Sequence, residues 1–222
     1  MSIKGILFDL DGVLVDTLHY HWLAWQKVFR ERGGEISKLT VLLHEGRTSK
    51  ELFPILMKEA GIYIPEEEQD SIIEKKRHYY RSIAQIELYP AALATIRELK
   101  RLGIKCALVT GSAKENMAKA LSSDMQSLFD VIITGNDISK GKPDPTPYNI
   151  AREKLGLKRE ECLVVENSPL GIQSAKRAKI RCIAVTTTLS KEQLIEASGA
   201  DQRADFYLEN LSELPELIRK LP

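Results

Sequence analysis

The pattern of apolar and polar positions divides the chain into short apolar runs and longer stretches with helical spacing. Five runs are continuously apolar and strand-sized, as expected of parallel strands buried on both faces: residues 3–9, 105–110, 131–134, 162–166 and 182–185. Helical spacing recurs around the last four, over residues 91–102, 113–122, 147–155 and 169–178. A weaker strand at 205–208 and a helix at 211–221 complete the chain. This order predicts an α/β fold with a doubly wound, Rossmann-like parallel sheet.

Residues 17–88 interrupt the alternation, because they contain no convincing strand pattern. They show helical spacing, broken by glycines and one proline, over residues 18–32, 36–44, 49–60 and 66–84. A crossover helix needs only about a dozen residues, so the insert is predicted to be an all-helical cap domain. We assign residues 16–88 to the cap and residues 1–15 and 89–222 to the core. The cap is expected over the carboxyl edge of the sheet, where open α/β sheets bind ligands.

Composition and charge narrow the function classes. Hydrophobic residues make up 43% and charged residues 28% of the chain, as in ordinary globular proteins. The net charge of +1 gives no nucleic-acid footprint, and no apolar run reaches the length of a membrane span. The start of the chain does not resemble a signal peptide. Three cysteines, each alone in an apolar run, predict reduced core thiols in a cytoplasmic protein. No oligomeric state is indicated.

The ends of the predicted strands carry polar side chains. In chain order these are Asp9 with Asp11 in the next turn, Thr110 in VTGS, Lys142 in SKGKPDP, and Glu166 with Asn167 in VENS. Parallel strands bring such ends to one edge of the sheet. Carboxylate oxygens suit a hard cation such as Mg²⁺, whereas a hydroxyl, a cation and helix N-terminal amides suit a phosphate.

Each of these features alone has an ordinary structural explanation. Acids after strands are common in turns and helix caps, and a loop lysine is usually a solvated surface charge. The four features in order, each at the end of a separate strand, indicate a functional site. The predicted ligand is a small phosphorylated substrate.

These residues resemble the signature of the haloacid dehalogenase superfamily, which here reads FDLDG, VTGS, GKPDP and VENS. The similarity covers the whole chain, and the helical insert takes the place of that family's cap. The stretch DTLHYHWLAW, residues 16–25, further resembles the β-phosphoglucomutase-like branch. The resemblance implies a Mg²⁺-dependent enzyme that transfers phosphoryl groups.

The resemblance assigns separate roles to the two acids after the first strand. It makes Asp9 the nucleophile that forms an aspartyl-phosphate. It makes Asp11 the general acid and then the general base, with its backbone carbonyl on Mg²⁺. Dehalogenases of this superfamily lack the second acid because a halide needs no proton. Asp11 therefore favours phosphoryl transfer over halide removal.

The other strand ends are expected to bind the transferring phosphoryl group. By resemblance, Thr110 donates to it with help from Gly111 and Ser112, and Lys142 bridges it to the nucleophile and stabilises charge. Lys140 is a competing lysine. Lys142 is preferred because it directly precedes a proline, as the family motif requires.

The metal site departs from the usual pattern at Asn167, where the superfamily carries an acid. Because an amide oxygen binds Mg²⁺ more weakly than a carboxylate, a further ligand is expected. Glu45, in the cap stretch LLHEGRTSKE, is the candidate, so the expected metal ligands are Asp9, Asp11, Glu45, Glu166 and Asn167. Gly46 and Arg47 of the same stretch are expected to bind substrate.

The combination of HEGRT and ENSPLG resembles a subgroup of the branch that hydrolyses inorganic pyrophosphate. If the cap closes until Glu45 touches the metal, little room is expected for a leaving group. Pyrophosphate is therefore the first predicted substrate, and sugar phosphates are the next.

A β-phosphoglucomutase is the alternative enzyme. His21, Trp25 and Arg47 have the spacing of that enzyme's cap residues, and Lys76 or Arg77 matches another. His21 and Trp25 also lie four residues apart on one helix face, so packing alone is a second explanation for them. A non-catalytic scaffold is disfavoured, since the signature acids and lysine are all present.

Overall fold

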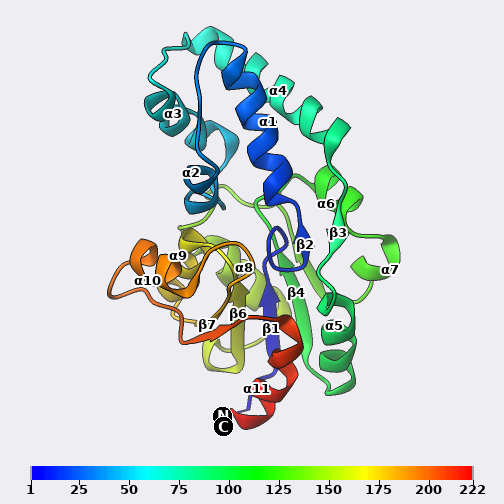
Figure 1. Ribbon diagram of the computed structural model, residues 1–222. Coiled ribbons are helices and arrows are strands. Elements are labelled where there is room, and N and C mark those ends of the chain that lie inside the picture. The colour runs from blue at the N-terminus through cyan, green and yellow to red at the C-terminus, as the bar shows by residue number, and fades with distance from the viewer. Residues whose placement is uncertain (1, 222) are drawn as a thin grey trace.

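A computed structural model describes residues 2–221, and its centre is a sheet of six parallel strands (Figure 1). The order across the sheet is β5-β4-β1-β6-β7-β8. The strands are β1 (Gly5–Phe8), β4 (Lys105–Val109), β5 (Val131–Ile133), β6 (Cys162–Glu166), β7 (Arg181–Val185) and β8 (Phe206–Leu208). The predicted doubly wound α/β core is confirmed, including the weak strand near residue 205.

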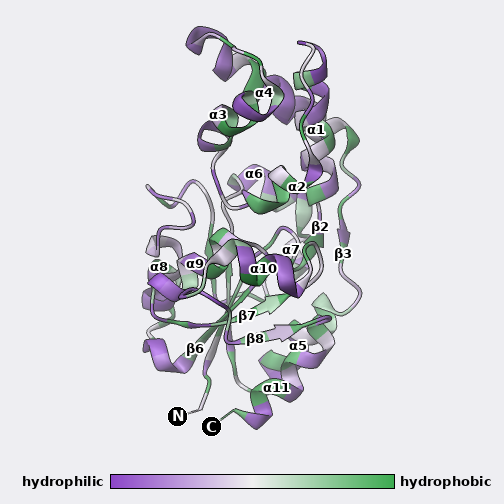
Figure 2. Cartoon of the chain, turned by 60° about the vertical axis from the view of Figure 1, so that its left-hand side comes forward, coloured by the Kyte–Doolittle hydropathy of each residue, from purple (hydrophilic) through white to green (hydrophobic). Residues whose placement is uncertain are grey.

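Both faces of the sheet are buried beneath helices, which explains why its strands read as continuous apolar runs. Ile6 and Phe8 of β1 pack into one apolar cluster, and Leu7 packs into the other. Helices α5 (Ala92–Arg101), α6 (Lys114–Ala120), α7 (Ser123–Gln126) and α11 (Leu214–Lys220) contribute to the first cluster. Helices α8 (Thr146–Leu155), α9 (Pro169–Arg177) and α10 (Lys191–Ser198) contribute to the second. Figure 2 shows hydrophilic and hydrophobic residues alternating along helices such as α11.

The helical insert lies beyond the carboxyl edge of the sheet, at the top of Figure 1. It contains α1 (Leu18–Arg30), α2 (Lys38–Leu43), α3 (Ser49–Ala60) and α4 (Glu66–Ile83). The start of α3 is fixed by a capping box, in which the Thr48 hydroxyl accepts from Glu51 N–H and the Glu51 carboxylate accepts from Thr48 N–H. The insert has its own apolar cluster, centred on Trp25, Phe29 and Phe53 with ring centroids 5.6–6.2 Å apart.

A small antiparallel ribbon joins the insert to the core. Strand β2 (Val15–Asp16) pairs with β3 (Glu87–Leu88), so the outgoing and returning segments lie side by side. The expectation that residues 17–88 contain no strand is wrong at β3, because two residues are too short to show periodicity. The predicted cap limits, 16 and 88, fall inside this ribbon, and the division into two domains stays a prediction.

Several short elements also differ from the sequence-based expectations. Helix α10 was not predicted, although Ser190 and Gln193 form a capping box that signals its start. The C-terminal helix begins as a 3₁₀ turn, Leu211–Glu213, before α11. A second 3₁₀ turn, Arg159–Glu161, precedes β6.

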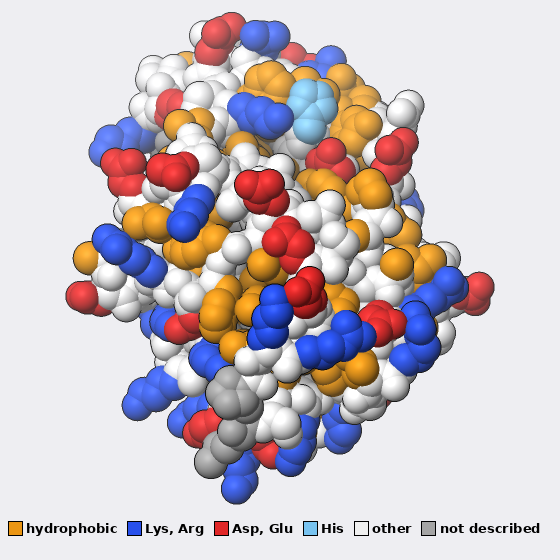
Figure 3. Space-filling model, turned by 60° about the horizontal axis from the view of Figure 1, so that its bottom comes forward, with side chains coloured by type: hydrophobic (Ala, Val, Ile, Leu, Met, Phe, Trp, Pro, Cys, Tyr) orange, Lys and Arg blue, Asp and Glu red, His pale blue; other side chains and the backbone are white. Residues whose placement is uncertain are grey.

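The distribution of surface charges and the state of the cysteines are as expected from the composition. Acidic and basic side chains are interspersed with apolar ones on the face seen in Figure 3. The three cysteines are buried and free. Within residues 2–221, no helix is both long enough and apolar enough to cross a membrane.

The separate apolar cluster of the insert leads to a prediction about its stability. Replacing Phe53 by Ala should destabilise the cap helices by about 3–5 kcal/mol, because Phe53 is fully buried among aromatic rings. Hydrogen exchange followed by mass spectrometry should show lost protection in α1–α4, with β1 and β6 unchanged. Tyr63→Ala, at a cap side chain that is 85% exposed, is the control. Equal loss throughout the core sheet would contradict an independent cap.

Candidate active site

The carboxyl edge of the sheet brings together the polar residues predicted from the strand ends. Asp9 directly follows β1, Thr110 follows β4, and Glu166 ends β6. Lys142 reaches the same place from the loop after β5, where its Nζ contacts Asp9, Glu166 and the Val109 carbonyl. The expected convergence is therefore present in the structure.

Lys142 lies between two carboxylates in the interior. Its Nζ donates to Asp9 Oδ1 and to Glu166 Oε1, the latter at 2.6 Å, and all three residues are at most 2% exposed. Burial alone would lower the pKa of Lys142, but attraction to the two carboxylates outweighs burial and raises it above its ordinary value. Lys142 is therefore a fixed cation. The competing lysine, Lys140, is exposed.

Glu166 is held by further hydrogen bonds. Its Oε1 also accepts from the Tyr148 hydroxyl at 2.6 Å, and its Oε2 accepts from the backbone N–H groups of Asn167 (2.9 Å) and Ser168 (3.2 Å). The residue is completely buried, and both of its oxygens are satisfied. Sequence reasoning missed Tyr148, because its position on an apolar helix face is that of an ordinary core residue.

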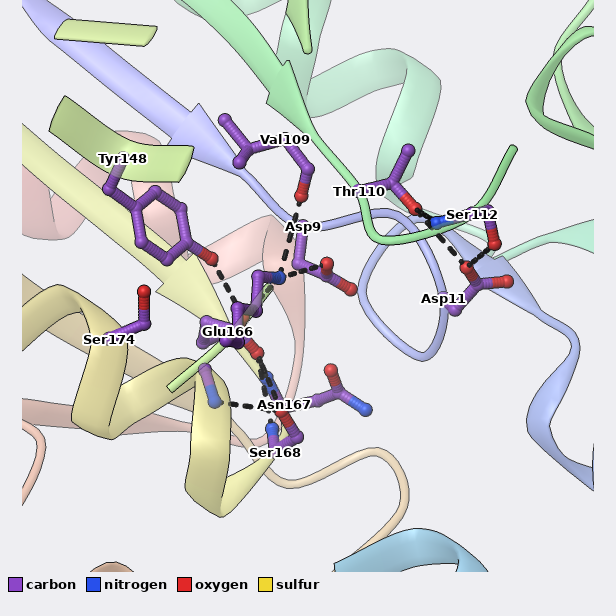
Figure 4. Close-up of polar contacts among 12 residues, drawn as sticks. Asp9, Asp11, Val109, Thr110, Ser112, Tyr148, Glu166, Asn167, Ser168 and Ser174 are labelled. Carbon is purple, nitrogen blue, oxygen red and sulfur yellow. Dashed lines mark hydrogen bonds and ion pairs between the residues drawn. The ribbon is translucent and has the colours of Figure 1, made fainter. Parts of the chain in front are cut away.

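Asp11 points toward the other side of the site. Its Oδ1 accepts from the Thr17 hydroxyl, and its Oδ2 accepts from Ser112 Oγ at 2.9 Å and, weakly, from Thr110 Oγ1 at 3.5 Å (Figure 4). Ser112 N–H in turn donates to Thr110 Oγ1 at 3.0 Å. The two acids thus belong to separate hydrogen-bond networks, and their different roles stay a prediction. Thr17 was not among the predicted site residues.

A loop of the cap reaches into this edge of the core. Gly46 has a φ of +94°, and a Cβ there would lie 3.2 Å from Lys142 Cβ. A Cβ on Gly141 would lie 3.4 Å from the Gly46 carbonyl oxygen. This close approach brings the neighbouring Glu45 to the acids of the core. One oxygen from each of Asp9, Glu45 and Glu166 lies within 4.8 Å of the others.

The residues at this point fit a hard cation. Asp9 Oδ2, Glu45 Oε2 and Asn167 Oδ1 are all buried, and none has a hydrogen-bond partner within the described part of the chain. All three belong to predicted metal ligands. Burial, reinforced by Glu166, raises the pKa of Glu45 to about 8. Three oxygens left without donors beside a surplus of carboxylates are the arrangement that Mg²⁺ satisfies.

A cavity of about 620 Å³ lies between the cap and the core. Asp11, Gly111 and Ser112 line it from the core, and the predicted cap residues His21, Trp25, Glu45, Gly46, Arg47 and Lys76 line it from above. A smaller cavity of about 200 Å³ shares Tyr80, Arg81 and Asn116 with it. Trp25 is only 2% exposed and also packs on Phe29, so packing and cavity lining are both part of its role.

Lys76 is the most unusual group in the cap. It is 4% exposed, its Nζ lies 2.9 Å from His21 Nδ1, and it sits 5.0 Å from the ring centroid of Trp25. Burial, helped by the nearby Arg77, lowers its pKa to about 7. Burial and the neighbouring Lys76 also lower the pKa of His21. Burial therefore favours the neutral form of both side chains beside the cavity.

Comparison with known proteins decides the family. The model of the haloacid dehalogenase-like hydrolases matches residues 6–185. The chain belongs to this family. The predicted resemblance is confirmed, and so is the prediction of a phosphohydrolase rather than a binding scaffold.

Individual relatives cover nearly the whole chain. It is 31% identical to hexitol phosphatase A of Escherichia coli K12, over 96% of this chain and 94% of the relative. It is 27% identical to the pyrophosphatase PpaX of Bacillus cereus, over 100% of this chain and 99% of the relative. A solved structure from Bacteroides vulgatus, provisionally assigned as a β-phosphoglucomutase, has 30% identity and a TM-score of 0.81, covering 97% of this chain and 87% of that one.

The low pKa of Lys76 predicts how stability depends on pH. Between about 7, its folded pKa, and its unfolded value of 10.5, the unfolded chain binds a proton that the folded protein does not. The contribution of Lys76 to the free energy of unfolding should therefore rise with pH across this interval. Lys76→Met should remove that rise, whereas Lys58→Met, at an exposed lysine of α3, should keep it. Urea titrations at several pH values measure the difference, and equal slopes in the wild type and Lys76→Met would contradict the assignment.

Proposed function

We propose that the protein is a Mg²⁺-dependent phosphatase that forms an aspartyl-phosphate on Asp9 and releases a leaving group of carbohydrate size. The observation that carries this proposal is the cavity of about 620 Å³, which persists while Glu45 is docked beside Asp9 and Glu166. Lack of room beside the docked Glu45 would favour the smaller pyrophosphate. The cavity argues against such crowding, because its volume falls in the range of sites that hold whole organic ligands.

The chemistry follows from the two hydrogen-bond networks. The Asp9 carboxylate attacks phosphorus, forming an O–P bond while the bond from phosphorus to the leaving oxygen breaks. Asp11, held by Thr17 and Ser112, gives its proton to that oxygen. Water then attacks the phosphorus of the aspartyl-phosphate, Asp11 takes the proton, and inorganic phosphate leaves with Asp9 restored.

The remaining groups stabilise charge during these steps. Lys142 keeps a positive charge against Asp9 throughout. Thr110 and Ser112 can donate to phosphoryl oxygens once they turn from Asp11. Mg²⁺, held by Asp9, Glu45 and Asn167 with the Asp11 carbonyl, would supply the charge that lets an anionic phosphate approach carboxylates. Glu166, already saturated with donors, is better suited to hold Lys142 than to bind the ion directly.

The lining of the cavity supports a polyhydroxylated leaving group. Trp25 and Tyr80 offer aromatic surface, and His21, Lys76 and Asn116 offer hydrogen-bonding groups around it. The adjoining cavity near Arg81 gives additional length. The relative named as a hexitol phosphatase supports the same substrate class.

A panel of substrates tests this proposal. Hexose and hexitol phosphates should be hydrolysed with a kcat/KM at least about tenfold above that of pyrophosphate, because an organic leaving group makes additional contacts with cap side chains such as Trp25 and Tyr80. Asp9→Asn should abolish turnover of every substrate, and acid quenching should trap phosphoprotein in the wild type alone. β-Glucose 1-phosphate belongs in the panel, with glucose 6-phosphate monitored.

Three results of the panel would contradict the proposal. The highest kcat/KM on pyrophosphate would support the second candidate below. Glucose 6-phosphate formed faster than phosphate would indicate a mutase. No phosphate release from any ester or from pyrophosphate would remove the phosphatase assignment for these substrates.

Inorganic pyrophosphate is the second candidate substrate. Glu45 favours it, because a cap carboxylate beside Asp9 replaces the charge that is missing at Asn167, as expected from the pyrophosphatase-like stretch HEGRT. Arg47 lines the cavity two residues away and can bind a second phosphate group. The relative PpaX is named as a pyrophosphatase.

The shared role of Glu45 in both candidates can be tested by exchanging charges. Glu45→Gln should weaken Mg²⁺ binding by at least about tenfold, measured by calorimetry without substrate. Adding Asn167→Asp in the same chain should restore most of the affinity, because it returns the lost negative charge to the site. Glu115→Gln, at an exposed acid of the cavity wall, is the control. An unchanged affinity in Glu45→Gln would show that Glu45 does not reach the metal.

A further inference from the structure

Asn167 is a candidate metal ligand, and its side-chain amide presents two chemically different groups, an oxygen and an NH₂. Only the amide oxygen can bind a cation, whereas the NH₂ group needs acceptors. In the structure Oδ1 is buried without a partner among residues 2–221, and Nδ2 donates to Thr188 Oγ1 at 3.1 Å. Figure 4 shows the amide extending away from Glu166 and its network. The orientation of this amide therefore decides whether an oxygen is offered to the ion.

Thr188 belongs to a run of three threonines directly after β7. The hydroxyl of the preceding residue, Thr187, donates to the carbonyl of Gly12, in the turn that also carries Asp11. Gly12 has a φ of +86°, and a Cβ there would lie 2.1 Å from Asn167 Nδ2. The amide is thus confined between the Gly12 turn and Thr188.

We propose that Thr188 is a positioning residue, which accepts from Asn167 Nδ2 and so directs Oδ1 toward the metal. This inference rests on the proposed Mg²⁺ site. A hydroxyl can accept or donate, but an amide whose oxygen is on a cation can only donate with its other end. Thr188 must then act as the acceptor. A side chain without an acceptor would leave Nδ2 buried and unpaired in the one orientation that binds the ion.

The test measures Mg²⁺ binding without substrate, by calorimetry on the full chain. Thr188→Val keeps the shape and removes the acceptor, and it should raise the Kd for Mg²⁺ about tenfold. Thr188→Ser keeps the hydroxyl and should stay within about twofold of the wild type. Thr186→Val is the matched control, because its hydroxyl faces the Leu208 carbonyl at 3.5 Å instead of the site. Melting curves without Mg²⁺ verify that each variant folds.

A second background separates amide orientation from general damage to the loop. In the Asn167→Asp variant either carboxylate oxygen can face the ion, so adding Thr188→Val should change the Kd by less than about threefold. The proposal is overturned if Thr188→Val alone binds Mg²⁺ like the wild type. It is equally overturned if Thr188→Val causes as large a loss of affinity in the Asn167→Asp background as it does in the otherwise wild-type chain.

Failure of the proposed function can be distinguished from failure of the positioning role. A wild type that binds Mg²⁺ but hydrolyses no substrate in the panel would refute the phosphatase proposal. The Mg²⁺ titrations of the Thr188 variants would still test the positioning role. A wild type that binds no Mg²⁺ would refute the positioning role together with the magnesium requirement.

Discussion

One buried lysine joins the parts of the carboxyl edge. Lys142 contacts Asp9 after β1 and Glu166 at the end of β6, and it reaches them from the loop after β5. Two carboxylates could not be buried together without a cation, because the desolvation cost of each is several kcal/mol. The positions of three segments distant in the sequence therefore depend on a single ammonium group. The Tyr148 hydroxyl and two backbone N–H groups also donate to Glu166, so its carboxylate is held from several sides.

This arrangement also determines what the cap must supply. Lys142 balances only one of the two core carboxylates, and Asn167 adds no charge. When the loop that carries Gly46 settles against Lys142, Glu45 brings a further acid into the same space. The carboxyl groups then exceed the cations in a region of low dielectric constant, which raises the pKa of Glu45. The proposed Mg²⁺ would relieve the repulsion and link cap and core. Docking of the cap loop and binding of the metal would then be coupled through the same charges.

The core could be read from the sequence, because its signals are local. Apolar runs such as CLVVE are strands at the predicted residues, and the acids, hydroxyl and lysine at the strand ends meet as expected. The β2–β3 ribbon could not be read, since two-residue strands carry no periodicity. Tyr148, Thr17 and Thr188 were missed for another reason. The contacts of these side chains depend on how the chain folds, which no local pattern reveals. A tyrosine on an apolar helix face, for example, gives no sign of the carboxylate that it contacts. The room left beside a docked Glu45 likewise depends on packing between helices, which no motif encodes.

The buried lysine of the cap, Lys76, has a different environment from the buried lysine of the core. The core lysine, Lys142, contacts two carboxylates. The cap amine of Lys76 is instead buried against His21, Trp25 and Tyr80, and its hydrogen-bond partner is an imidazole rather than a carboxylate. Burying an amine in this way favours its neutral form and lowers its pKa to about 7. An anionic phosphate ester bound in the adjoining cavity would reverse that preference, since it would stabilise the protonated amine. Binding of such an ester and uptake of a proton by Lys76 would then be linked. Part of the free-energy cost of burying this amine would be recovered when the anion binds, whereas a neutral sugar without phosphate would not recover it.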